Sequence, residues 1–222
     1  MANRTAPEAI NVRGTNPQFL LDKIVRSRIY EARFWLEECF ALTAELLVDK
    51  IVDLKYIGGC YGGNSKASNF LCLLLKMLQI QPEKEIIIEF LRNEEYKYMR
   101  ALAAIYVRLV FPAVDCYNYL EPLYLDYRKL RFMKSDGKFK VITMDEYIDS
   151  LLRDERVCDI IMPTLPLRRV LEELDMLEPR KSILDELVSE SDQEQDDNEG
   201  DDKKEEAPTE PTETGDDDKH VT

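Results

Sequence analysis

The chain has 222 residues, of which 44 are acidic and 30 basic, and its formal net charge is −14. Residues 183–222 carry the whole excess, with 17 acidic and 3 basic side chains, so residues 1–182 are formally neutral. A neutral body argues against a general electrostatic attachment to nucleic acid, and no apolar run is long enough to cross a membrane. Five widely spaced cysteines without a CxxC pair indicate reduced thiols in a cytosolic or nuclear protein.

The chain is predicted to begin with a flexible arm, followed by helices. Residues 1–15 are polar and show no hydrophobic period. A helix is predicted to begin at Asn16-Pro17, because asparagine caps free N–H groups and proline fits the first helical turn. Apolar residues recur at helical spacing over 19–29, which predicts that their side chains lie inward. After a second short helix, Thr43 is predicted to cap a third.

A glycine-rich segment interrupts the helices at residues 58–64, which hold four of the eight glycines. Glycine is poor inside helices and permits positive φ, so a loop is predicted there. A structural loop is favoured over a phosphate site, because the segment follows a helix and lacks a suitably placed lysine. The pattern from 69 to 109 then predicts three helices with short joints, the first beginning at Asn69.

The next segment combines a broken helix with the only strand signal in the sequence. The helical pattern over 113–131 should break or kink at Pro122, because proline removes a donor and clashes with the preceding turn. The residues 135–137, Ser-Asp-Gly, lie between two alternating apolar runs and predict a tight β-hairpin. Thr143 and Glu146 then fit a capping box at the start of another helix.

The predicted fold class is mainly α, a single multi-helix globular domain over residues 16–182 with one small β-hairpin. A last helix is predicted over 167–177, between two prolines. Residues 183–222 have too few apolar side chains to offset an ordering cost of about 1–2 kcal/mol per residue. They are predicted to form a disordered acidic tail.

The sequence shows no constellation of catalytic or metal-binding residues. The sole histidine, His220, lies in the predicted tail, which argues against Ser–His or Cys–His catalysis and against His-ligated zinc. Neighbouring carboxylates such as Glu94 and Glu95 point about 100° apart on a helix and do not converge. We therefore expect no catalytic residue, no cofactor and no metal, and interpret the chain as a non-enzyme.

A cluster of aromatic and basic residues is the candidate binding site. Its members lie within 15 residues of one another: Tyr117, Tyr119, Tyr124, Tyr127, Arg128 and Arg131. Three interpretations stay open at this point. The tyrosines could pack in the core with their hydroxyls at the rim, contact a partner protein, or stack on the bases of single-stranded RNA beside the arginines.

Many short segments of the chain match one known family in order and without large gaps. They lie at 14–20 (GTNPQFL), 28–31, 37–40, 42–45, 58–64 (GGCYGGN), 70–73, 76–84 (KMLQIQPEK), 115–117, 119–124, 126–129, 155–161 and 170–173. Together they span about residues 14–179. On these segments the chain resembles the N-terminal domain of the pre-mRNA-splicing factor 38 family.

The resemblance implies a nuclear, predominantly helical scaffold of the tri-snRNP and the precatalytic spliceosome, needed for spliceosome activation. It also implies two classes of partner, a zinc-finger splicing protein and a microfibrillar-associated-type protein, which bind largely as helical segments. Where many animal members carry Arg–Ser repeats, this chain has the acidic residues 183–222. Direct single-stranded RNA binding through the Tyr/Arg cluster is the alternative function.

Overall fold

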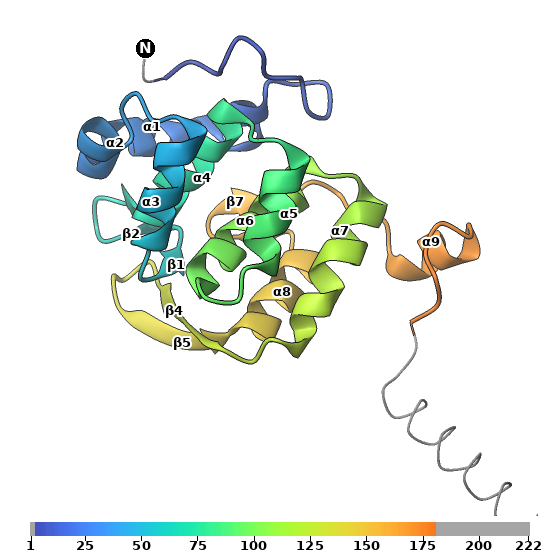
Figure 1. Ribbon diagram of the computed structural model, residues 1–222. Coiled ribbons are helices and arrows are strands. Elements are labelled where there is room, and N and C mark those ends of the chain that lie inside the picture. Colours follow the sequence, from blue (N-terminus) through green and yellow to red (C-terminus); the bar gives the residue numbers. More distant parts are fainter. Residues whose placement is uncertain (1–2, 181–222) are drawn as a thin grey trace, which may run out of the picture. The chain divides into compact units, whose positions relative to one another are not determined.

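Two buried helices lie at the centre of the fold in the computed structural model, which describes residues 3–180 (Figure 1). Helix α4 (Asn69–Ile80) buries every residue from Phe70 to Gln79, and α6 (Lys97–Val110) buries every residue from Met99 to Leu109. A helix that is buried on all sides needs apolar residues around its whole circumference. The sequences NFLCLLLKMLQI and KYMRALAAIYVRLV meet this condition except at a few polar positions.

Shorter helices surround this centre. They are η1 (Pro17–Leu20), α1 (Lys23–Glu31), α2 (Arg33–Glu38), α3 (Ala44–Val52), α5 (Lys84–Arg92), α7 (Ala113–Leu120), η2 (Glu121–Leu125), α8 (Met144–Arg153) and α9 (Arg168–Glu173). The mainly α fold class is confirmed. So are three predicted caps: the Asn16 side chain accepts from the N–H of Gln18, Thr43 accepts from Leu46, and Thr143 forms a capping box with the third residue of α8.

Short strands add small sheets at the edge of the helices. The strands are β1 (Ile57–Gly58), β2 (Cys60–Tyr61), β3 (Lys66–Ala67), β4 (Lys129–Met133), β5 (Phe139–Thr143), β6 (Arg156–Val157) and β7 (Ile160–Ile161). Strands β4 and β5 form the predicted hairpin, which pairs Arg131 with Val141. Strand β1 adds to β4 in parallel, and β2–β3 and β6–β7 are two further antiparallel pairs.

The glycine-rich segment differs from its prediction, because part of it forms β1 and β2 instead of a plain loop. Gly58 and Gly59 pass close to other parts of the chain. A Cβ at Gly59 would lie 2.2 Å from Oδ2 of Asp159, the same carboxylate oxygen that accepts a 2.6 Å hydrogen bond from the N–H of Cys60. The glycine therefore permits close contact between this strand and the turn between β6 and β7.

Replacing Gly59 by alanine should lower the free energy of unfolding by about 2 kcal/mol, because the added methyl group overpacks a contact that has no spare room. Urea denaturation of the full chain measures the change. Gly63→Ala is the matched control, since nothing lies within 4 Å of a Cβ at that position. Equal stability of the two variants would contradict the proposed role of Gly59.

Two details of the predicted helices are wrong. Phe19 and Ile24 were expected inward but are 54% and 66% exposed. The reason is that η1 ends before Leu21 and α1 begins at Lys23, so the helical phase changes between them. Helix α9 ends at Glu173, four residues before the predicted end. Helix α4 begins at Asn69, as predicted, and is capped by Ser68.

The predicted N-terminal arm makes several hydrogen bonds to the helical body. The N–H of Ala6 donates to the carbonyl of Gln79, and the Arg13 guanidinium donates to the carbonyls of Leu109 and Phe111. The flexibility of residues 1–15 stays a prediction. The predicted acidic tail, residues 183–222, lies outside the described residues.

Candidate functional site

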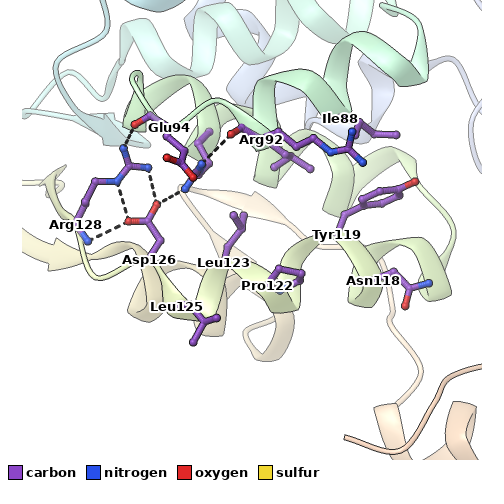
Figure 2. A pocket seen from close by; sticks show the side chains of 12 residues that line it. Ile88, Arg92, Glu94, Asn118, Tyr119, Pro122, Leu123, Leu125, Asp126 and Arg128 are labelled. Carbon is purple, nitrogen blue, oxygen red and sulfur yellow. Dashed lines mark hydrogen bonds and ion pairs between the residues drawn. The ribbon is translucent and has the colours of Figure 1, made fainter. Parts of the chain in front are cut away.

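A groove lies between the end of α5 and the continuous segment formed by α7 and η2 (Figure 2). Its volume is about 880 Å³. We call it the α5/η2 groove, and it is lined by Ile88, Leu91, Arg92, Glu94, Arg100, Asn118, Tyr119, Pro122, Leu123, Leu125, Asp126 and Arg128. Figure 2 shows Arg128, Asp126 and Glu94 at one end of the groove, and Ile88, Tyr119 and the side chain of Arg92 at the other.

The predicted break at Pro122 shapes the apolar wall. Helix α7 ends at Leu120, and the chain continues as the 3₁₀ helix η2 with Pro122 in its first turn. Leu123 is buried against the core, whereas Leu125 is 63% exposed at the groove. On the opposite wall, Ile88 is half-buried. The exposed leucine on one wall and the partly covered isoleucine on the other offer apolar surface that a partner could remove from water.

The charged end is organised around one carboxylate. Oδ2 of Asp126 lies 2.7 Å from Nη1 of Arg100 and 2.6 Å from Nη2 of Arg128. The side chains of Arg100 and Asp126 are only 10% and 8% exposed. Nη2 of Arg100 also donates to the carbonyl of Arg92 at 3.1 Å, and Arg128 donates to the carbonyl of Glu94. These bonds join α5, α6 and the end of η2.

Burial alone would raise the pKa of Asp126, but hydrogen bonds from Arg128 and Arg100 outweigh it and hold this pKa at about 2. The carboxylate is therefore ionised at neutral pH and is shared by two permanent cations. With Arg92 and Glu94 included, the lining has one more cation than anion. Nε of Arg100 is also buried without a hydrogen-bond partner in the part of the chain that the structure describes.

The structure brings only part of the predicted Tyr/Arg cluster together. Tyr119 and Arg128 line the groove. Tyr117 is buried and its hydroxyl donates to the carbonyl of Pro166 at 2.8 Å. The half-buried Tyr124 donates to Asp149 on α8.

The last two members of the cluster lie elsewhere on the surface. Tyr127 is 68% exposed but does not line the groove. The Arg131 guanidinium lies over the Phe139 ring of the β4–β5 hairpin, 4.3 Å from its centroid. The cluster thus divides among the core, the groove and a separate sheet face, and its role as one binding site stays a prediction.

Sequence reasoning missed the acidic centre of the groove. Asp126 and Arg128 are two residues apart in the segment 126–129, and this spacing alone does not indicate an ion pair. Arg100 lies 26 residues earlier in the chain, on α6. The available signal is a mostly apolar helix that contains two arginines, Arg100 and Arg108, since a buried arginine requires partners. It does not identify which carboxylate provides them.

The other chemically active groups in the described residues are arranged for structure. All five cysteines are free and buried. Burial raises the pKa of the Cys39 and Cys158 thiols to about 12 and that of Cys116 to about 11, which keeps them protonated and poorly nucleophilic at neutral pH. Residues 3–180 contain no group of three or more histidine, cysteine, aspartate or glutamate side chains that could hold a metal ion. Over the same range no helix is long and apolar enough to span a membrane.

Comparisons with known proteins agree on one family. The model of the PRP38 family matches residues 10–175. "Pre-mRNA-splicing factor 38" of Drosophila melanogaster is 62% identical over 186 residues, which are 84% of this chain and 56% of that protein. "Pre-mRNA-splicing factor 38A" of Xenopus laevis is 61% identical over the same share of this chain and 60% of that protein. The chain thus spans less than two thirds of the length of these curated relatives.

A solved structure has the same fold. It is described as "Crystal structure of the Snu23-Prp38-MFAP1(217-258) complex of Chaetomium thermophilum". The match has a TM-score of 0.75 and 40% sequence identity, and it covers 84% of this chain and 99% of that chain. Identity at this level supports homology as well as likeness of fold.

Proposed function

Since this chain belongs to the PRP38 family, we propose that it is a non-enzymatic pre-mRNA splicing factor that holds other proteins in the spliceosome. Its place of action is then the nucleus, within the tri-snRNP and the precatalytic complex, where it supports spliceosome activation. Burial keeps the Cys39, Cys116 and Cys158 thiols protonated and poorly nucleophilic, which supports a role that involves no bond-making.

One observation carries this proposal. In the Snu23-Prp38-MFAP1(217-258) complex, the match covers 99% of the similar chain. Nearly all of that chain, as it is present in the complex, is therefore shared with the chain described here. The corresponding partners here are a zinc-finger splicing protein and a microfibrillar-associated-type protein. A segment from the second of these is present in the solved complex, which indicates that a short stretch of partner chain is enough for association.

The α5/η2 groove is our candidate for one of the docking sites. A helical segment places apolar side chains at intervals of three and four residues on one face, which suits a groove with apolar side chains on its walls. Leu125 and Ile88 provide apolar surface on opposite walls, and Arg128 lies at the charged end, away from Ile88 (Figure 2). The extra cation favours a segment with a carboxylate next to its apolar face.

Replacing Leu125 by aspartate should weaken binding of the MFAP1-type segment at least tenfold, because it puts a charge where apolar contact is expected. Isothermal titration calorimetry of the full chain with a synthetic segment measures the dissociation constant. Leu125 is 63% exposed, so its replacement should leave the fold intact, as a circular dichroism melt checks.

Ile24→Asp on α1 is the matched control, because Ile24 is also apolar and 66% exposed but lies outside the groove. If both variants bind as the natural chain does, the groove is not the docking site although the scaffold function stands. If the natural chain binds neither this segment nor the zinc-finger protein, the proposed function is wrong.

A further inference from the structure

The β4–β5 hairpin carries a local excess of positive charge that the neutral total conceals. Between residues 129 and 140 there are five basic side chains and one acidic one, Asp136. The basic residues are Lys129, Arg131, Lys134, Lys138 and Lys140, and all five are exposed. None of them forms an ion pair with another described residue, although ion pairs occupy many other surface arginines and lysines.

The same hairpin exposes apolar surface beside these charges. Phe139 and Val141 are 44% and 60% exposed. The register pairs Arg131 with Val141 and Met133 with Phe139, so Arg131, Phe139 and Val141 share one face of the sheet. The Arg131 guanidinium lies 4.3 Å from the centroid of the Phe139 ring, and the Tyr56 ring packs edge-on against the same ring at 5.6 Å. An exposed arginine thus lies over an aromatic ring that is itself packed against a second ring.

We propose that this face of the β4–β5 hairpin binds single-stranded RNA. Unpaired bases stack on aromatic rings and on guanidinium planes, and the surrounding cations pair with backbone phosphates. The hairpin offers both elements together, because Lys129 lies on the same face as the Arg131–Phe139 pair. Lys140 pairs with Phe132 on the other face of the same two strands and adds positive charge at the free edge of β5. An acidic peptide could use the cations but has no need of the stack, so the observations favour RNA.

This inference lies outside the proposed scaffold function, because it concerns a different surface and a different class of partner. It also relocates the RNA-binding alternative that the Tyr/Arg cluster suggested. Tyr117 and Tyr124 are held by hydrogen bonds inside the helical body, and Arg128 is neutralised by Asp126. Of that cluster, only Arg131 lies on the hairpin face.

The test is a fluorescence anisotropy titration of the full chain with a labelled short oligouridylate at two salt concentrations. The natural chain should bind in the micromolar range, and its affinity should fall as salt rises. The double variant Lys129→Glu with Arg131→Glu, which changes the two cations of this face, should lose at least tenfold in affinity and show a shallower salt dependence. Phe139→Leu should lose several-fold with the salt dependence unchanged, since it removes the stacking ring and keeps the charges.

The matched control is the double variant Lys23→Glu with Arg156→Glu, which changes the net charge equally at exposed positions outside the hairpin. It should retain most of the affinity. The proposal is overturned if the natural chain does not bind the oligonucleotide, if the control loses as much as the hairpin variant, or if polyglutamate competes as well as RNA. Thermal melts of every variant confirm that a loss comes from the surface and not from unfolding.

Discussion

Replacing Asp126 by asparagine should lower the free energy of unfolding by about 3 kcal/mol at neutral pH, as measured by urea denaturation. The change removes the one carboxylate that serves Arg100 and Arg128, and Arg100 is then left as a buried cation without an anion. Breaking one side of a buried ion pair typically costs about 3–5 kcal/mol, because the remaining charge has lost its compensation. We take the lower end, since the Arg128 side chain is 34% exposed and can turn to water.

The stabilisation by Asp126 should depend on pH in one direction only. The folded protein holds the pKa of this carboxyl at about 2, below its ordinary value of 3.8, so the unfolded chain binds the proton more tightly. The contribution is therefore complete above about pH 4 and is lost as the pH falls toward the folded pKa. The difference in unfolding free energy between the natural chain and Asp126→Asn should stay constant from pH 5 to 8 and shrink below pH 4.

Glu173→Gln is the control for this pair of expectations. Glu173 also accepts from an arginine, Arg169, but their side chains are 60% and 86% exposed. Exposed ion pairs contribute about 0–1 kcal/mol, so this variant should be nearly as stable as the natural chain. Similar losses for Glu173→Gln and Asp126→Asn would contradict the view that the groove is held together by a buried carboxylate.

Replacing Arg108 by alanine should cost about 3–4 kcal/mol, again measured by urea denaturation. This arginine of α6 is 3% exposed, and its guanidinium donates to the carbonyls of Leu151 and Pro163 at 2.8 and 2.7 Å. Each hydrogen bond from a charged donor contributes about 1.5–3 kcal/mol, and the variant leaves two carbonyls without their donor. Amide hydrogen exchange should also become faster between residues 151 and 163, because Arg108 connects that segment to the core.

Arg33→Ala provides the comparison for Arg108. Arg33 makes an ion pair with Glu37 on the same helix, but its side chain is 86% exposed, so we expect almost no loss of stability. If Arg108→Ala were equally mild, the buried guanidinium would have to be replaced by water without penalty. That result would refute its structural role.

Local signals in the sequence predicted much of the fold. Three helix caps depend only on residues within three positions of the capping side chain, at Asn16, Thr43 and Thr143. The break at Pro122 depends only on the preceding turn. Each could therefore be predicted without knowledge of tertiary contacts. The Ser-Asp-Gly turn specified the β4–β5 hairpin in the same way. Phe19 and Ile24 were misplaced because a change from a 3₁₀ to an α-helix shifts the phase of the pattern without any marker residue.

The candidate site was less predictable, because it depends on contacts between distant parts of the chain. The carboxylate of Asp126 meets Arg100 across 26 residues, and Asp159 meets the N–H of Cys60 across 99. Two-residue strands such as β6 and β7 are too short for an alternating pattern, so they depend on the same kind of contact. The Tyr/Arg cluster was close in sequence but divides among three environments in the fold.

Amide hydrogen exchange of the full chain, with and without the MFAP1-type segment, tests the central claim most directly. Docking in the α5/η2 groove predicts slower exchange over residues 88–94 and 118–128, with α1 and α2 unchanged. Protection that appears only in other elements would contradict the groove as the docking site. Absence of protection anywhere at saturating concentrations of the segment would contradict its binding altogether.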